Sequence, residues 1–377
     1  MRRFTLVLAV ALAVTASVLA ANASASSRLL KGLFDEANTL TGDPDRTFPV
    51  LRQLNTKALR TDLYWGGRYG VADSRPLEPT DPDDPAYDWS LYDRTVNYAQ
   101  QFGIKVVFSI WGTPRWANGG RRPNIAPTNP VDLQRFARAA ARRYSGRWVA
   151  EDGRGLPRVE FWLAWNEPNN PVFLAPQFKR VGRKYVRWAA HDYARICNAV
   201  VSGVHGAGYR TQKVACGATA PGGNNSPTSS RPSISPVAFL RSMKAYGAKG
   251  FDAYAHHPYH ANPSESPATP PKGVNTVTLG NINVLIKELT QLYGAKRVWI
   301  TEYGYQTNPP DKLFGVSWAK QAAYLKQAYA IARANPRIDM LLWFLLKDDT
   351  APGGWQSGLM TATGRHKPSF IQFQRIR

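Results

Sequence analysis

Residues 158–168 read Arg-Val-Glu-Phe-Trp-Leu-Ala-Trp-Asn-Glu-Pro. The run of apolar, β-branched and aromatic residues predicts a buried strand, and the polar Asn166-Glu167-Pro168 ends it because proline cannot continue a strand ladder. A similar arrangement returns at residues 297–304, where Arg-Val-Trp-Ile-Thr is followed by Glu302, Tyr303 and Gly304. Two predicted strands that each end in a glutamate are therefore the starting point for interpreting the rest of the chain.

Alternating strand and helix patterns extend in both directions from these segments. Apolar runs with β-branched or aromatic content predict eight strands, at residues 30–34, 58–64, 105–110, 158–164, 213–217, 251–255, 297–301 and 339–345. Helical periodicity lies between them, at residues 49–54, 90–102, 131–144, 179–205, 236–246, 279–293 and 317–334, and only residues 368–374 follow the last strand. This alternation predicts parallel strands joined by right-handed crossovers.

Eight strand–helix units are typical of a closed (β/α)8 TIM barrel, and the length of 377 residues allows one such barrel as a single domain. We therefore predict an α/β fold with one barrel over residues 26–377. Long segments rich in proline, glycine and asparagine follow predicted strands, at residues 65–87, 112–129, 220–235, 260–277 and 347–364. Because loops at the carboxyl ends of barrel strands form the catalytic face, we expect a ligand-binding rim rather than disordered linkers.

The first 25 residues have the pattern of a signal peptide. Arg2 and Arg3 precede an apolar run at residues 6–20, and Ala-x-Ala cleavage sites lie at residues 21–23 and 23–25. An uncleaved membrane anchor is the alternative, but the run is shorter than the ~20 residues that a spanning helix needs. We therefore predict export to the extracellular space or the cell envelope, with no stable membrane insertion after cleavage.

The chain is strongly basic, with 48 Lys+Arg against 26 Asp+Glu and a formal net charge of +22. A nucleic-acid binder would gather its cations on one face, whereas these are spread through several predicted helices, so we expect no nucleic-acid partner. Attraction to an anionic envelope or an acidic glycan is one interpretation of the charge. A solvated surface that is simply basic is the other.

The cysteines and histidines give no cofactor signature. Cys197 and Cys216 could pair in an exported protein, or both could be buried thiols. No glycine-rich phosphate-binding motif stands in a strand–turn–helix context, and no zinc-ligand spacing is present. We expect neither a cofactor nor a metal.

Glu167 and Glu302 follow the fourth and the seventh predicted strands, and a closed barrel brings both to one face. One such carboxylate alone is more often a surface or ion-pair residue. Two carboxylates across one pocket are what glycoside hydrolysis requires, since a protonated one donates to the leaving oxygen and an ionised one attacks the anomeric carbon. Their joint placement among tryptophans and tyrosines favours this chemistry.

On these residues the chain resembles the clan A retaining glycoside hydrolases, (β/α)8 enzymes whose acid/base and nucleophile follow the fourth and seventh strands. Asn166-Glu167-Pro168 resembles the acid/base motif of the clan, and Thr-Glu-Tyr-Gly at residues 301–304 resembles its nucleophile motif. Arg-Thr-Asp at residues 60–62 and Thr-Pro-Arg-Trp-Ala at residues 113–117 are most similar to families 39 and 5. The resemblance implies a retaining β-glycosidase with Glu167 as acid/base and Glu302 as nucleophile.

The resemblance also implies substrate-binding residues around the two glutamates. Arg60 matches the arginine that hydrogen-bonds the nucleophile, and Asn166 matches the residue that contacts the sugar 2-hydroxyl. His257 and Tyr259 match a His-x-Tyr pattern in which the histidine lines the subsite and the tyrosine bonds the nucleophile. His256 beside His257 also suggests a metal, but neighbouring side chains on a strand point to opposite sides, which argues against a shared ion.

Three tryptophans are candidate sugar platforms, because an aromatic face suits the C–H face of a pyranose. Trp343 resembles the sugar-stacking tryptophan of the clan, although its apolar neighbours make core packing a serious alternative. Trp111 and Trp116 follow the third predicted strand, where packing that supports the loop is an equally good interpretation. Asp35, Glu36 and Asn38, after the first strand, are weaker candidates for polar contacts.

The mechanism that we expect is double displacement with retention, in which the two carboxyl groups lie about 5–5.5 Å apart. Burial and the charge of Glu302 would raise the pKa of Glu167. The expected partner is a β-linked poly- or oligosaccharide, acidic glycans included, and the protein is expected to be a monomer. A noncatalytic glycan-binding barrel is the alternative, which the presence of both glutamates disfavours. The sugar, the linkage and endo or exo action stay open.

Overall fold

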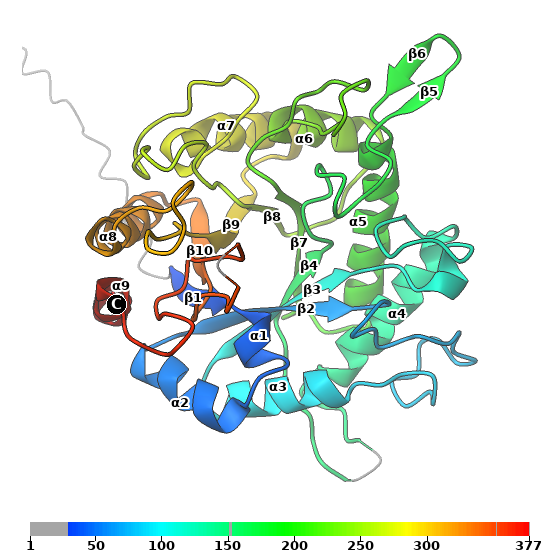
Figure 1. The fold of residues 1–377 in the computed structure, drawn as a ribbon. Coiled ribbons are helices and arrows are strands. Elements are labelled where there is room, and N and C mark those ends of the chain that lie inside the picture. The colour runs from blue at the N-terminus through cyan, green and yellow to red at the C-terminus, as the bar shows by residue number, and fades with distance from the viewer. Residues whose placement is uncertain (1–28, 151–152, 352, 377) are drawn as a thin grey trace, which may run out of the picture.

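The computed structural model describes residues 29–150, 153–351 and 353–376, and its centre is a closed barrel of eight parallel strands (Figure 1). Around the barrel the strands follow the order β1-β10-β9-β8-β7-β4-β3-β2. Their bounds are β1 Leu30–Phe34, β2 Ala58–Tyr64, β3 Lys105–Trp111, β4 Phe161–Ala164, β7 Lys213–Thr219, β8 Ala253–His256, β9 Arg297–Tyr303 and β10 Ile338–Phe344. The (β/α)8 barrel predicted from the sequence is confirmed, whereas the predicted signal peptide lies outside the described residues.

Most of the helices form a ring around the barrel, and the shortest one, which directly follows β1, lies inside that ring (Figure 1). The helices are α1 Glu36–Thr39, α2 Pro44–Gln53, α3 Ser90–Gln101, α4 Pro130–Arg143, α5 Trp188–Gly206, α6 Pro236–Ala245, α7 Ile282–Tyr293, α8 Trp318–Ala334 and α9 Pro368–Arg375, with 3-10 turns at Arg115–Ala117 and Leu279–Asn281. Among residues 29–376, as far as they are described, no helix has both the length and the apolar character needed to cross a bilayer.

The barrel interior and the space outside it hold separate apolar clusters, because successive strand residues point to opposite sides of the sheet. The inner cluster consists mainly of small side chains around one tryptophan and comprises Ala58, Val107, Leu163, Ala215, Ala218, Ala253, Ala255, Trp299, Met340 and Leu342. The larger outer cluster fills the layer between strands and helices. Both clusters are needed to hold the strand ends in register, and the strand ends position the site.

Several predicted boundaries were wrong, among them the starts of three elements. The predicted helix at residues 179–205 begins instead at Trp188, and a separate antiparallel hairpin of β5 (Lys179–Val181) and β6 (Lys184–Val186) precedes it. Gly182 has a φ of +59° in the turn, which glycine adopts without strain and which interrupts a helix. The helix predicted at residues 49–54 begins earlier, at Pro44, because Asp43 caps it. The fourth strand begins at Phe161, three residues after its predicted start.

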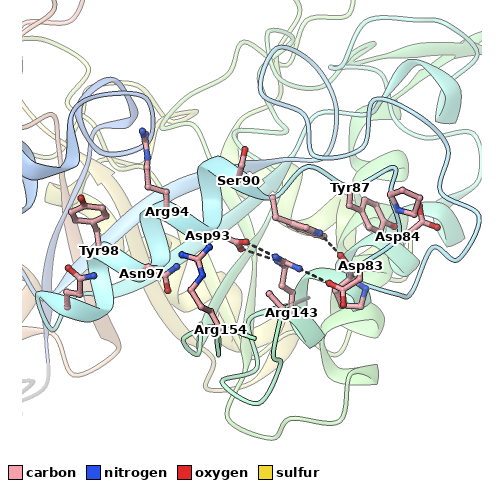
Figure 2. A pocket seen from close by; sticks show the side chains of 15 residues that line it. Asp83, Asp84, Tyr87, Ser90, Asp93, Arg94, Asn97, Tyr98, Arg143 and Arg154 are labelled. Carbon is pink, nitrogen blue, oxygen red and sulfur yellow. Dashed lines mark hydrogen bonds and ion pairs between the residues drawn. The ribbon is translucent and has the colours of Figure 1, made fainter. Parts of the chain in front are cut away.

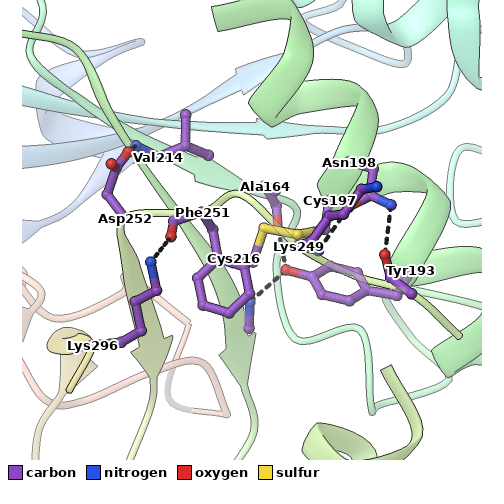
Figure 3. The surroundings of a disulfide bond; sticks show 12 residues. Ala164, Tyr193, Cys197, Asn198, Val214, Cys216, Lys249, Phe251, Asp252 and Lys296 are labelled. Carbon is purple, nitrogen blue, oxygen red and sulfur yellow. Dashed lines mark hydrogen bonds between the residues drawn. A yellow bond between two sulfur atoms is a disulfide. The ribbon is translucent and has the colours of Figure 1, made fainter. Parts of the chain in front are cut away.

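Cys197 and Cys216 form a disulfide that joins α5 to β7 (Figure 3). The Cα atoms lie 5.8 Å apart and both side chains are fully buried. Beside the bridge, the Tyr193 hydroxyl donates to Ala164 O (2.8 Å) and accepts from Gly217 N (2.5 Å), so that α5 is also hydrogen-bonded to β4 and β7. Of the two alternatives that the sequence left open, the structure has the bridged one.

We expect the double variant Cys197→Ala/Cys216→Ala to lose about 3 kcal/mol of unfolding free energy. The bridge lowers the entropy of the unfolded chain, and closure of a loop of this length corresponds to a free energy of that order. The two cysteines are separated by 19 positions. Urea denaturation at equilibrium measures the loss. Wild-type protein refolded in a reducing agent serves as the control and should unfold near the midpoint of the variant. An unchanged midpoint in the reducing agent would show that the thiols are not bridged.

Candidate active site

The chain turns sharply after β4, at the carboxyl ends of the barrel strands. Trp165 and Glu167 have φ values of +71° and +35°, a region that costs a residue with a Cβ about 1–3 kcal/mol. Backbone bonds hold the turn, since Trp165 N donates to Ile110 O and Glu167 N donates to Ala218 O, both at 2.9 Å. The strained backbone directs the Glu167 side chain into the barrel mouth, where a hydrogen bond joins it to a residue after β8.

Asn169 clamps a second loop onto this turn. Its Nδ2 donates to Ile234 O (2.9 Å) and its Oδ1 accepts from Ala220 N (2.8 Å), with the side chain fully buried. Residues 220–235, the loop after β7, are therefore tied at both ends to the loop that carries Glu167. Asn169 was not among the predicted residues, because a second asparagine after Asn-Glu-Pro carries no signal of its own.

Glu302 lies near the carboxyl end of β9, and Arg60 of β2 reaches it with a bond of 2.6 Å from Nη1 to Oε1. The Tyr259 hydroxyl donates to the other oxygen, Oε2, at 3.2 Å. Nη2 of Arg60 donates to Asn166 Oδ1 (2.8 Å) and to Asp62 Oδ1 (3.0 Å). Burial opposes the charge on Arg60, but the negative charges of Asp62 and Glu302 outweigh it and raise its pKa, so the guanidinium stays cationic.

His257 lies between the two glutamates. Complete burial lowers its pKa to about 4, so the ring is neutral near pH 7. Its Nε2 lies 3.2 Å from Arg60 Nη1 and 3.0 Å from Thr301 Oγ1. Because a guanidinium only donates, Nε2 must accept, which assigns the ring proton to Nδ1. Nδ1 then donates to Glu167 Oε1 at 3.1 Å.

Burial raises the pKa of the Glu167 carboxyl to about 7. A bond of 3.1 Å from Asn170 Nδ2 to Oε2 acts in the opposite direction, as do the positive charges of Arg60 and Arg231. Burial is therefore the dominant cause, rather than the charge of Glu302 that the sequence analysis also invoked. A carboxyl group of this kind is partly protonated near neutral pH, which suits a proton donor.

A carboxylate oxygen of Glu167, a carboxylate oxygen of Glu302 and a ring nitrogen of His257 all lie within 4.8 Å of one another. Three such groups are a possible set of metal ligands. They fit a cation poorly, because the Arg60 guanidinium already bonds Glu302 and faces the Nε2 of His257. His256, the adjacent histidine, bonds Thr219 and Val277 instead. The arrangement favours acid–base and nucleophilic chemistry over metal chemistry.

The structure separates the three predicted sugar platforms. Trp343 is fully buried and its indole donates to Ser357 O at 2.9 Å, so it has no face open to a sugar and belongs to the core, as the alternative interpretation held. Trp116 donates to Ala72 O (2.9 Å) and supports the loop after β3. Trp111 is half-buried, and its Nε1 has no hydrogen-bond partner among the described residues. Of the three, Trp111 is the one whose surroundings suit a platform.

Trp355, in the loop after β10, is an aromatic residue near the site that was not predicted. Its side chain is 55% exposed, and its ring packs edge-on against Phe344 with the ring centroids 5.7 Å apart. Phe344 in turn contacts Tyr259, which bonds Glu302. An exposed aromatic face thus stands next to the wall of the site on the side of Glu302. The Gly-Gly-Trp sequence at residues 353–355 was the available signal.

A second carboxylate pair lies behind Arg60. Glu36 Oε1 accepts from Asp62 N at 2.9 Å, and Glu36 Oε2 accepts from the Tyr64 hydroxyl at 2.8 Å. Burial and then the charge of Asp62 raise the pKa of Glu36 to about 8. The weak candidate Glu36 therefore lies close to the predicted residues, and Asp62 is a further carboxylate in contact with Arg60 that the sequence analysis used only as part of a motif.

A cleft of 960 Å³ opens elsewhere, beside α3 on the outer wall of the barrel (Figure 2). Arg143 lies in it and bonds Asp93 through Nε (3.0 Å) and Nη2 (2.6 Å), with a further ion pair to Asp83 at 3.2 Å. Figure 2 shows these charges directed at one another across the cleft. None of the predicted site residues lines it. The network ties α3 to α4 and needs no ligand to balance its charges.

Solved structures of similar fold are glycoside hydrolases. A family 39 glycoside hydrolase from the gut symbiont Bacteroides cellulosilyticus WH2 matches with a TM-score of 0.63 and 20% identity, over 94% of this chain and 64% of the other. A monomeric β-xylosidase from Caulobacter crescentus CB15 matches with a TM-score of 0.60 and 17% identity, over 92% and 67%. Fungal β-1,4-galactanases match with a TM-score of 0.56 and 13% identity, over 92% and 99%. These likenesses show the fold that the chain shares with such enzymes.

At the level of sequence, only part of the chain matches a known family model. Residues 238–377 match the model of a family of unknown function, DUF5722. No curated protein matches the sequence. The chain spans about two thirds of the length of the Bacteroides and Caulobacter proteins, so their complete architecture is larger than the barrel described here.

Proposed function

We propose that this chain is a retaining β-glycosidase in which Glu167 is the acid/base and Glu302 the nucleophile. The observation that carries the proposal is the pair of facing glutamates, in which one carboxylate oxygen of Glu167 lies within 4.8 Å of one carboxylate oxygen of Glu302. Retaining enzymes hold their two carboxyl groups about 5–5.5 Å apart, whereas inverting enzymes need about 6.5–9.5 Å to admit a water molecule. The hydrogen bonds to the two glutamates also differ. Glu302 accepts from Arg60 and Tyr259, whereas Glu167 accepts from His257 and Asn170, and this difference supports a nucleophile and an acid/base.

In the first step an oxygen of Glu302 attacks the anomeric carbon while protonated Glu167 gives its proton to the departing glycosidic oxygen. Arg60 and Tyr259 bond the two oxygens of Glu302 and hold the carboxylate in place. In the second step ionised Glu167 removes a proton from water, which attacks the glycosyl ester and releases Glu302. Neutral His257 donates to Glu167, so its bond favours the ionised form that the second step needs.

We expect kcat/KM for a glycoside with a poor leaving group to fall as the pH rises through about 7. The sign follows from the role, because a carboxyl group with a raised pKa is protonated below that pH and loses its proton above it. Initial rates across the pH range measure this limb. Glu36, with a pKa raised to about 8, is the neighbouring group that also titrates, so the Glu36→Gln variant serves as the control and should keep the limb near pH 7. A limb near pH 4 would contradict the assignment of Glu167.

The test of the function is release of reducing ends from a panel of soluble glycans, with the first-formed anomer followed by NMR. Because the structures of similar fold include a β-xylosidase and β-1,4-galactanases, xylans and galactans belong in the panel beside β-glucans, mannans and acidic exopolysaccharides. Release with the β-anomer formed first would support the proposal. Release of the α-anomer would indicate inversion and overturn it, as would no release together with equal binding by wild type and Glu302→Gln.

We further propose that the protein acts outside the cytoplasm, in the extracellular space or at the cell envelope. The N-terminal Arg-Arg, the apolar run and the Ala-x-Ala sites support export. The Cys197–Cys216 bridge agrees with it, since disulfides persist in oxidising compartments. Amino-terminal sequencing of protein secreted from an expressing cell tests this, with a mature terminus near residue 26 as the expected result and a retained Met1 as the contrary one.

A further inference from the structure

A basic hairpin projects from the loop that follows Glu167. It comprises residues 179–187, in which β5 and β6 pair only with each other and the turn lies at Gly182 and Arg183. In Figure 1 it extends beyond the ring of helices, next to α5 and α6. The hairpin holds five cations and no acidic residue, and all five are exposed: Lys179, Arg180, Arg183, Lys184 and Arg187.

The fold makes little use of these side chains. In the described part of the chain none of the five cations takes part in an ion pair, and Lys179 lies over the Trp188 ring at 3.8 Å. The strand residues Val181 and Tyr185 are 56% and 50% exposed. An isolated two-stranded hairpin is only marginally stable in water. Apolar and cationic side chains that stay exposed on such a hairpin therefore point to a role in binding rather than in folding.

The register places cations beside apolar groups. Arg180 is paired with Tyr185, and Val181 is paired with Lys184. Directly opposite residues of a hairpin lie on the same face, so each face carries a cation next to an apolar side chain. A sugar ring with a carboxylate substituent offers the matching chemistry, an apolar C–H face with an anion at its edge.

The root of the hairpin is fixed to the acid/base loop. The buried side chain of Gln177 donates from Nε2 to Pro168 O (2.9 Å) and to Leu174 O (2.7 Å). The backbone carbonyl of Gln177 accepts from Ala189 N (3.2 Å). The hairpin therefore starts from the side of the mouth where Glu167 lies. Because Glu167 must contact the glycosidic oxygen, the leaving-group part of a polymer extends over this side.

Arg231 continues the positive charge toward the site. It is exposed on the loop of residues 220–235, which Asn169 ties to the same acid/base loop, and its charge acts on Glu167. No ion pair of Arg231 is found within the described ranges. Positive charge thus lies both beside the acid/base and on the hairpin that leaves its loop.

We propose that the basic hairpin, with Arg231, binds the leaving-group end of an acidic polysaccharide that carries carboxylate groups. This assignment rests on the proposed function, because the leaving-group end is defined by Glu167 as acid. A polysaccharide is preferred over a lipid surface because one continuous chain would pass from the mouth onto the hairpin. The surface gives the enzyme a preference for acidic over neutral glycans that is located on the leaving-group side of the mouth, whereas a basic net charge alone would attract polyanions to any part of the protein.

The test compares two sets of four charge removals in the Glu302→Gln background, which allows binding to be measured without turnover. The hairpin set is Lys179→Gln, Arg180→Gln, Arg183→Gln and Lys184→Gln. The control set removes four exposed cations on α4, α7 and α8, namely Arg135→Gln, Arg138→Gln, Lys287→Gln and Lys326→Gln. Affinity for β-1,4-linked polymannuronate is measured at low and at high salt, and methyl-esterified polymannuronate is the neutral polymer. Circular dichroism and thermal melting check the folding of each variant.

We expect the hairpin set to weaken binding of polymannuronate by about tenfold to a hundredfold at low salt, and the control set to leave it nearly unchanged. The methyl-esterified polymer should bind weakly to every form. Equal losses in both sets would reduce the effect to net charge and overturn the proposal, as would unchanged binding by the hairpin set. Hairpin-dependent binding to vesicles of phosphatidylglycerol and phosphatidylcholine that is as tight as binding to polymannuronate would also overturn the proposal, in favour of a membrane surface.

The outcome is separable from that of the proposed function. Hairpin-dependent binding without hydrolysis of any glycan would contradict the proposed glycosidase activity and support the acidic-polysaccharide surface. Hydrolysis with retention but no loss of binding in the hairpin set would support the proposed glycosidase activity and contradict the acidic-polysaccharide surface. As a second variant, replacement of residues 179–186 by a Gly-Ser linker removes the surface without relying on four substitutions, and it should show the same loss.

Discussion

The Glu302→Gln variant is expected to lose at least about 10⁴-fold in kcat against every glycoside that the wild type hydrolyses. Glutamine has nearly the same shape and can still accept a bond from Arg60 or from Tyr259, the two donors that hold the carboxylate. It has no anionic oxygen that can form the glycosyl ester, so the first step fails. Steady-state rates on the best substrate of the panel, with thermal melting beside them, measure the effect.

The matched control for this variant is Glu160→Gln. Glu160 precedes β4 at the opposite end of the barrel from the mouth, where it pairs with Lys105 at 2.8 Å and with Arg158 at 2.6 Å. It removes the same charge from the same residue type without touching the site, so kcat should stay close to that of the wild type. If Glu302→Gln retained more than about one hundredth of kcat, another group would have to be the nucleophile.

Much of the barrel and of the site could be predicted from the sequence, because both depend on short-range patterns. Apolar runs define strands, and a closed parallel barrel then forces strand ends together whatever their separation in sequence. The predicted site residues Arg60, Asn166, His257 and Tyr259 are brought together by the fold, in contact with one another or with the two glutamates. Burial of the site, which raises the pKa of Glu167, follows from the same packing.

What could not be predicted depends on three-dimensional surroundings. Trp343 has the sequence context of a platform, but its indole N–H donates to the backbone carbonyl of Ser357 in the loop that covers it, and its face is buried. The basic hairpin reads as part of a helix, since lysine and arginine favour helices and the single Gly182 is a weak stop signal. The contact of Glu36 with Asp62 joins residues of two different strand ends, and no local pattern reports it.

The Glu167→Ala variant is expected to separate the two steps of the reaction. On a glycoside with a poor leaving group, kcat/KM should fall by about 10²–10⁴-fold, because no acid protonates the departing oxygen. On a dinitrophenyl glycoside, whose leaving group needs no proton, formation of the glycosyl-enzyme should be nearly as fast as in the wild type. Water then attacks slowly without a base, so the intermediate should accumulate and appear as a burst of dinitrophenolate.

Azide distinguishes a missing base from a damaged site, because it attacks the glycosyl-enzyme without giving up a proton. It should restore turnover of the dinitrophenyl glycoside in Glu167→Ala and yield the β-glycosyl azide, since two displacements retain configuration.

The companion variant is Asn170→Ala, which removes the bond of 3.1 Å that lowers the pKa of Glu167. It keeps the acid, so it should move the alkaline limb to higher pH without any dependence on the leaving group. Equal losses on both leaving groups in Glu167→Ala, with no rescue by azide, would show that Glu167 positions the substrate and transfers no proton.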